Sequence, residues 1–139
     1  MYTVCHRELN TITMKEATKK KILILEDEKP LAHALELKLT HEGFEVTTTD
    51  NGETGINLIT KEKFDLILSD LIIPGVDGFG VLEAIKAKKL KVPVIVMTNL
   101  NQEEDKKRAY DLGALSFFVK SNSPISEIVQ NIKKTLDAS

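Results

Sequence analysis

Residues 22–25 read ILIL and residues 26–28 read EDE, and this junction decides the fold. Four consecutive apolar residues indicate a β-strand that is buried on both faces, as in a parallel sheet covered by helices. Pro30 then suits the first turn of a helix, and Gly43 is placed to end that helix. The stretch therefore predicts a buried strand that leads through acidic residues into a helix.

The same alternation of apolar runs and helical patterns continues along the chain. Four further runs predict strands at residues 44–48, 64–69, 92–97 and 117–119. A helical pattern follows each run, and Asp50 with Glu53 has the capping-box spacing of a helix start. Five strands alternating with five helices predict an α/β fold, with a doubly wound parallel sheet that is covered on both faces.

Composition limits the classes of function. The 139 residues suit one domain, and because 42% are hydrophobic and 29% are charged, a fully disordered chain is not expected. The net charge is -2, so we expect no direct nucleic-acid binding, which requires a surplus of basic residues. The single cysteine, Cys5, excludes a disulfide framework. We expect no membrane association, because no apolar run approaches the roughly 20 residues of a membrane span.

The beginning of the chain differs from the rest. Residues 1–19 have no clear helical or strand period, and we interpret them as a flexible N-terminal extension. The domain is predicted to occupy residues 20–139. Residues 1–15 contain no continuous apolar stretch, so we expect no signal peptide and a reducing, cytoplasmic setting.

Polar residues follow four of the predicted strands at the point where each strand ends. Residues 26–28 follow the first strand, Asp70 the third, Thr98 and Asn99 the fourth, and Lys120 the fifth. The carboxyl ends of parallel strands meet at one edge of a sheet, where α/β proteins bind their ligands. We therefore expect these side chains to converge on one crevice.

The chemistry of this set is consistent. Converging carboxylates repel each other unless a cation lies among them, and oxygen ligands favour Mg²⁺. An aspartate can act as a nucleophile toward a phosphoryl group, whose charge a metal ion and a lysine would neutralise. The sequence has no Gly-x-x-x-x-Gly-Lys phosphate loop, so an ordinary nucleotide hydrolase is not expected.

Four separated motifs carry a resemblance to a known family. They read ILEDEKP at residues 24–30, DLILSDLIIPGVDG at 65–78, PVIVMT at 93–98 and GALSFFVK at 113–120. In this order they resemble the receiver domain of two-component response regulators. The resemblance implies a flavodoxin-like three-layer sandwich, with five parallel strands in the order 2-1-3-4-5 and five helices.

The resemblance also implies an acidic site with a phosphoacceptor. Asp70 falls at the position of the phosphorylated aspartate. Glu26 and Asp27 match the acidic pair that organises Mg²⁺, with Asp27 as the direct ligand. The backbone carbonyl of Ile72 would complete the protein's share of the metal coordination.

Three more residues match the family's switching apparatus. Thr98 is at the position of the switch hydroxyl, Lys120 at that of the lysine that pairs with the phosphoryl group, and Phe117 at that of the switch aromatic. The chain departs from the family at three positions, and the first of them is Phe117, whose ring lacks a hydroxyl, so that its switch would work by packing alone. Ser121 stands where proline is usual, and Asn99 stands where a small residue is usual.

The function that the resemblance implies is phosphorelay signalling by a stand-alone receiver. A histidine kinase or phosphotransfer protein would phosphorylate Asp70, and the fourth helix, fifth strand and fifth helix would then control a partner protein. Such a domain promotes its own Mg²⁺-dependent phosphorylation and dephosphorylation but is not a metabolic enzyme. Nothing after Leu136 resembles a helix-turn-helix, so we expect no DNA-binding output in this chain.

Two other functions remain open at this stage. The chain could be a protein-binding module of receiver fold that works without phosphorylation, and Asn99 and Ser121 favour this reading. It could also be a small phosphotransferase or phosphatase that acts on outside substrates. That function requires a roomy pocket and further acid–base groups, which the sequence does not clearly offer.

Overall fold

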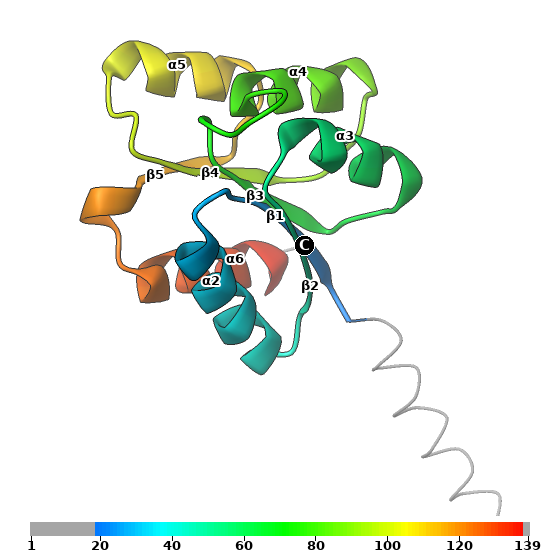
Figure 1. Cartoon of the computed structure of the whole chain (residues 1–139), viewed down its shortest axis with the longest axis vertical. Coiled ribbons are helices and arrows are strands. Elements are labelled where there is room, and N and C mark those ends of the chain that lie inside the picture. Colours follow the sequence, from blue (N-terminus) through cyan, green and yellow to red (C-terminus); the bar gives the residue numbers. More distant parts are fainter. Residues whose placement is uncertain (1–18, 138–139) are drawn as a thin grey trace, which may run out of the picture.

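The computed structural model describes residues 19–137, and its centre is one five-stranded sheet (Figure 1). The expected extension, residues 1–19, lies outside the described residues except for Lys19. The strands are β1 (Lys21–Leu25), β2 (Glu45–Thr49), β3 (Leu66–Ser69), β4 (Val94–Thr98) and β5 (Ser116–Val119). The helices are α2 (Lys29–His41), α3 (Gly52–Lys61), α4 (Gly78–Ala87), α5 (Glu103–Asp111) and α6 (Ile125–Asp137). A short 3₁₀ turn, η1 (Lys120–Asn122), joins β5 to α6.

All strand pairs are parallel, and the strand order is β2-β1-β3-β4-β5. This topology confirms the predicted doubly wound fold. The chain runs outward from β1 to β2 and then returns to β3 on the other side of β1. Such a reversal of strand order opens a crevice beyond the carboxyl ends of β1 and β3.

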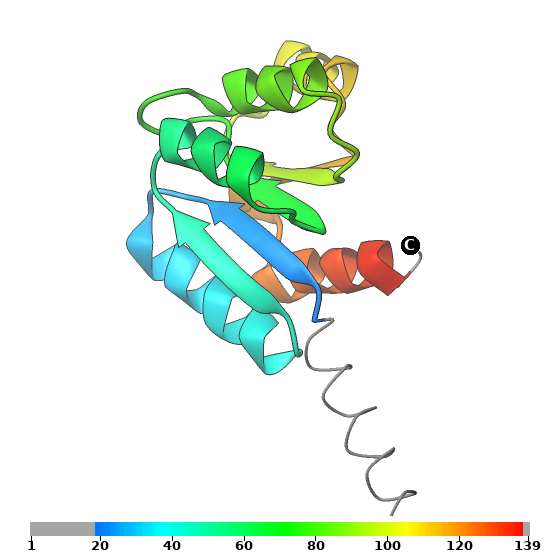
Figure 2. The ribbon, with the colours of Figure 1, turned by 90° about the vertical axis from the view of Figure 1, so that its right-hand side faces the viewer.

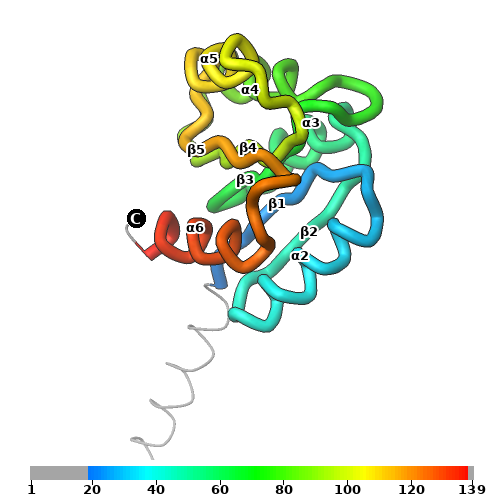
Figure 3. Tube along the Cα trace, turned by 90° about the vertical axis from the view of Figure 1, so that its left-hand side faces the viewer, coloured from blue at the N-terminus to red at the C-terminus, as the bar shows by residue number. Residues whose placement is uncertain are grey.

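Helices cover both faces of the sheet and make it the middle of three layers. Helices α3, α4 and α5 lie on one face, and α2 and α6 lie on the other (Figures 1, 2 and 3). The strand ILIL explains this arrangement, because successive side chains of a strand point to opposite faces. Leu23 and Leu25 pack into the core between the sheet and helices α3, α4 and α5. Ile22 and Ile24 pack into the core between the sheet and helices α2 and α6. All four are fully buried.

One helix start differs from the prediction. Asn51, rather than Asp50, caps α3, and its side-chain oxygen accepts hydrogen bonds from the N–H groups of Glu53 (2.8 Å) and Thr54 (3.2 Å). Strand β2 continues to Thr49, one residue beyond the predicted end, so the turn and the helix start also move along the chain. The capping-box prediction was therefore wrong by one residue.

The loop after β3 folds back on itself. The N–H of Gly78 donates to the carbonyl of Leu71 at 2.9 Å. A Cβ atom at Gly78 would overlap the carbonyl oxygen of Asp70 and lie 2.5 Å from the Cα of Leu71. The position therefore requires glycine, and the close approach fixes the chain on the C-terminal side of Asp70.

Candidate functional site

The sheet brings the predicted residues to one edge through backbone hydrogen bonds. The N–H of Glu26 donates to the carbonyl of Thr49, and the N–H of Asp70 donates to the carbonyl of Leu25, both at 3.0 Å. Glu26 thus directly follows the end of β1, and Asp70 directly follows the end of β3. Thr98 ends β4, and Lys120 directly follows β5. The prediction that these side chains converge is therefore correct.

Three carboxylates form an acidic cluster at this edge. Glu26, Asp27 and Asp70 each offer one oxygen, and these oxygens lie within 4.8 Å of one another. Glu26 and Asp70 are only 2% and 4% exposed, whereas Asp27 is exposed to solvent. A cleft of about 260 Å³ opens over the cluster. Its lining residues are Asp27, Glu28, Asp70, Ile72, Thr98, Asn99 and Lys120.

Lys120 extends its ammonium group into the acidic cluster. Its Nζ lies 2.6 Å from Asp70 Oδ2, 2.7 Å from Glu26 Oε1 and 3.0 Å from Glu28 Oε1. The Lys120 side chain is 9% exposed. One nearly buried cation thus balances part of the charge of several carboxylates. The Lys120 side chain spans the distance from the end of β5 to the loop after β1 to make these contacts.

The electrostatics of the site follow from burial and these ion pairs. Burial raises the pKa of the Glu26 carboxyl, and this effect outweighs the opposing effects of Lys120 and the Glu28 N–H. Burial alone would lower the pKa of the Lys120 ammonium, but contacts with Asp70, Glu26 and Glu28 together hold that pKa above its ordinary value. Lys120 is therefore charged at neutral pH.

The cluster fits a hard divalent cation. All its offered ligand atoms are oxygens, which is the donor set of Mg²⁺ in proteins. Within residues 19–137, the Lys120 ammonium at 2.7 Å is the one partner of Glu26 Oε1. Such a buried oxygen has a lone pair free for a second cation. The N–H of Ile72 donates to Asp70 Oδ1 at 3.1 Å, and metal ligation by the Ile72 carbonyl stays a prediction.

The two predicted switch residues lie in different surroundings. Thr98 is fully buried and lines the cleft, and its hydroxyl oxygen accepts a long 3.4 Å hydrogen bond from the N–H of Leu100. Phe117 is partly buried on β5 and does not line the cleft. Its ring centroid lies 6.4 Å from that of Tyr110 on α5. The structure therefore places Phe117 next to the helix layer and away from the carboxylates.

Two contacts at this edge were not predicted. Glu28, the last of the three acidic residues after β1, adds a third carboxylate to Lys120. Asn99 Oδ1 accepts a hydrogen bond from the N–H of Ser121 at 3.2 Å. The bond between Lys120 and Ser121 is trans, as are all peptide bonds in the described part of the chain. The EDE motif contained the signal for Glu28, but nothing in the sequence pairs Asn99 with Ser121.

Comparison with known proteins decides the family. A sequence model described as the response regulator receiver domain matches residues 22–133. The chain belongs to this family. The receiver domain is also similar to the cell cycle response regulator CtrA of Brucella ovis, with 37% identity over 100 residues. That match covers 72% of this chain and 43% of the Brucella protein, so the chain spans less than half the length of such relatives.

Solved structures support the same assignment. The non-phosphorylated HemR receiver domain from Leptospira biflexa has a TM-score of 0.81 and 26% identity, over 87% of this chain and 97% of that chain. A CheY-like receiver domain protein from Methanospirillum hungatei has a TM-score of 0.80 and 27% identity, over 87% and 96%. No helix of the receiver domain within residues 19–137 has the length and apolar character that crossing a membrane requires.

Proposed function

We propose that this receiver domain accepts a phosphoryl group on Asp70 from a histidine kinase or phosphotransfer protein and then signals to a protein partner. The observation that carries the proposal is the 2.6 Å contact between Lys120 Nζ and Asp70 Oδ2, beside an acidic cluster suited to a cation. The site combines a nucleophile, a fixed ammonium and metal ligands in one cleft. Phosphoryl transfer requires these parts.

Each side chain has a separate task in the transfer. An oxygen of Asp70 attacks phosphorus while the bond from phosphorus to the donor histidine nitrogen breaks, and that nitrogen leaves with the bonding electrons. Lys120 stays beside Asp70 and neutralises charge on the phosphoryl oxygens. Mg²⁺ held by Glu26, Asp27 and Asp70 would supply the remaining neutralisation of charge.

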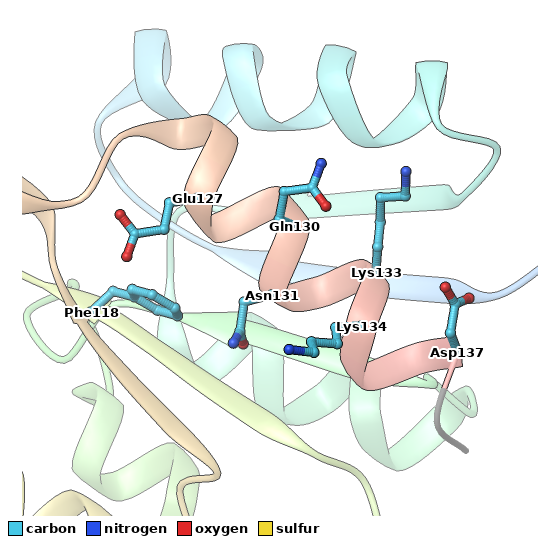
Figure 4. A pocket seen from close by; sticks show the side chains of 7 residues that line it. All are labelled: Phe118, Glu127, Gln130, Asn131, Lys133, Lys134 and Asp137. Carbon is cyan, nitrogen blue, oxygen red and sulfur yellow. The ribbon is translucent and has the colours of Figure 1, made fainter.

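The output surface is the face formed by α5, β5 and α6. Tyr110, on α5, is 47% exposed and lies next to Phe117 on β5. A groove of about 590 Å³ lies along α6 (Figure 4). Phe118 reaches this groove from β5, and the other lining residues belong to α6: Glu127, Gln130, Asn131, Lys133, Lys134 and Asp137. A partner that binds there would respond to changes in β5.

Intact-mass measurement with acetyl phosphate tests phosphorylation directly. We expect one added phosphoryl group that depends on Mg²⁺ and is absent in Asp70→Asn. Asp77→Asn is the matched control, because Asp77 lies in the same loop and its Oδ1 accepts the cap bond from Gly80 N–H, which asparagine retains. No adduct with acetyl phosphate or other small phosphodonors would reject the proposal and favour a binding module that works without phosphorylation.

The wider role of the protein follows from the same proposal. A cytoplasmic kinase or phosphotransfer protein is the expected donor, and a protein rather than nucleic acid is the expected target of this domain. The domain would catalyse its own phosphorylation and dephosphorylation without processing outside substrates. Its role is then signalling and not metabolism.

A further inference from the structure

A hydrogen bond joins the two loops that follow β4 and β5. Asn99 Oδ1 accepts it from the backbone N–H of Ser121 at 3.2 Å, and 22 positions separate the two residues in the sequence. Asn99 directly follows Thr98, and Ser121 directly follows Lys120. The bond therefore connects the backbone next to the buried hydroxyl with the backbone next to the ammonium group.

The position of this bond is outside the ladder of the sheet. The register of β4 and β5 ends at the pair Thr98 and Val119. Beyond that pair the chain leaves the sheet and enters the exposed turn η1, which begins with Lys120. The contact of Asn99 with Ser121 thus extends the link between the two strands past the point where regular pairing stops.

Asn99 is not the cap of a helix. The N-cap of α5 is Gln102, so the Asn99 side chain does not cap the helix that follows it. The contact needs an acceptor at residue 99 and a backbone N–H at residue 121. An alanine at the first position or a proline at the second would remove it.

We propose that Asn99 and Ser121 form a latch that positions Lys120 for phosphoryl transfer to Asp70. This inference rests on the proposed function. A long lysine side chain loses much conformational freedom when its ammonium is held in one place, and an anchored backbone reduces the number of arrangements to be lost. The latch fixes the first backbone group after Lys120. Asn99 is uncharged, so it does so without adding charge to the acidic cluster.

A different role for Asn99 has to be separated from the latch. Asn99 lines the cleft, so its bulk alone could limit access of a phosphodonor to Asp70. Asn99→Leu keeps a similar volume but cannot accept a hydrogen bond, whereas Asn99→Ala loses both volume and acceptor. If Asn99 acts as a latch, Asp70 is phosphorylated more slowly in both variants. If Asn99 acts only through its bulk, the rate of phosphorylation is unchanged in Asn99→Leu and higher in Asn99→Ala.

The experiment measures the rate of phosphorylation by acetyl phosphate with Mg²⁺, followed by intact mass. We expect Asn99→Leu and Asn99→Ala to react about two- to tenfold more slowly, the effect of losing one positioning hydrogen bond. Ser121→Ala keeps the N–H and should react like wild type.

Amide hydrogen exchange of Ser121 gives a second readout that does not depend on phosphorylation. Protection of this N–H should fall in Asn99→Leu and persist in Ser121→Ala. Equal rates of phosphorylation in wild type and Asn99→Leu, or a faster Asn99→Ala, would overturn the latch while leaving the proposed function intact. If wild type takes up no phosphoryl group, the proposed function fails, and unchanged Ser121 exchange in Asn99→Leu would separately reject the latch.

Discussion

Lys120 Nζ and Asp70 Oδ2 lie 2.6 Å apart, although 50 positions separate the two residues in the sequence. The contact crosses from β5 to β3 over the end of β4, so it depends on the whole parallel arrangement of the sheet. Glu26 and Glu28 contact the same ammonium group. Lys120 thus holds together three carboxylates that would otherwise repel one another, and its removal has consequences for stability.

We expect Lys120→Met to destabilise the metal-free protein by about 2–3 kcal/mol. Removal of one partner leaves uncompensated charges, and the effect stays below that of a fully buried pair because Glu28 is exposed to water. Urea unfolding measures the loss. Lys107→Met is the control, since the ion pair of Lys107 with Asp111 is highly exposed. Equal stability of Lys120→Met and wild type would contradict the electrostatic role.

Addition of Mg²⁺ should raise the melting temperature. At about ten times its dissociation constant, a ligand of the folded state stabilises by about 1.4 kcal/mol, or roughly 4–6 °C for a domain of this size. Asp27→Asn should lose most of this increase, because Asp27 is the exposed carboxylate of the cluster. Differential scanning fluorimetry with Mg²⁺, and with Na⁺ at matched ionic strength, decides the matter. An equal increase in Asp27→Asn would count against a site at this cluster.

Glu26→Gln should make the metal-free protein more stable at pH 7. Burial raises the pKa of Glu26 above its ordinary 4.5, so the folded chain binds more protons there than the unfolded chain. The free energy of unfolding therefore falls as the pH rises from the ordinary pKa of Glu26 through its raised pKa in the folded protein. An uncharged glutamine avoids this loss of stability. Melting temperatures between pH 4.5 and 7.5 should depend less on pH in Glu26→Gln, with the exposed Glu83→Gln as control. A less stable Glu26→Gln at pH 7 would show that the Lys120 ion pair outweighs burial.

Gly78→Ala should destabilise the fold by about 1–3 kcal/mol and slow phosphorylation of Asp70. Its methyl group would meet the backbone of Asp70 and Leu71, which cannot move aside without displacing the phosphoacceptor. Gly80→Ala is the matched control on the same helix, because its methyl group would mainly meet the tip of the Val76 side chain. We expect Gly80→Ala to stay within about 1 kcal/mol of wild type. Similar losses in both variants would reject this explanation.

The sequence was sufficient to predict the fold and the convergence of polar side chains at one edge of the sheet. Four consecutive apolar residues such as ILIL indicate a strand buried on both faces. Alternate side chains of this strand do enter the cores on the two faces of the sheet. The positions of Asp70 and Lys120 follow because parallel strands place their carboxyl ends together. These features depend on residue type and strand direction, which are both visible in the sequence.

Local geometry was harder to predict. Asp50 and Asn51 are both good caps, and only the length of β2 decides between them. Glu28 reaches Lys120 because of the direction in which the chain enters α2. The contact between Asn99 and Ser121 depends on two loops whose conformations are set by tertiary packing. Such contacts have no sequence period and appear only in three dimensions.

Thr98 is the residue through which we expect phosphorylation to change the output face. Its hydroxyl is fully buried and, within residues 19–137, makes only the 3.4 Å contact with the N–H of Leu100, so the O–H can turn toward new acceptor oxygens on Asp70. A hydrogen bond to a charged group contributes about 1.5–3 kcal/mol, enough to shift a two-state equilibrium roughly ten- to hundredfold. Movement of Thr98 would leave space behind β4 for the Phe117 ring.

Thr98→Ala should therefore still accept a phosphoryl group on Asp70 but lose the response of the face that bears Lys107, Tyr110 and Phe117. Amide hydrogen exchange of residues 101–120, measured before and after phosphorylation, reports that response. Thr98→Ser keeps the hydroxyl and should respond like wild type, which separates the hydrogen bond from the loss of a methyl group. A ligand shifts an equilibrium only through different affinities for the two states, and this hydroxyl supplies the difference. If Thr98→Ala shows the wild-type change in exchange, the hydroxyl does not couple the site to the face, and a contact such as that of Lys120 must do so instead.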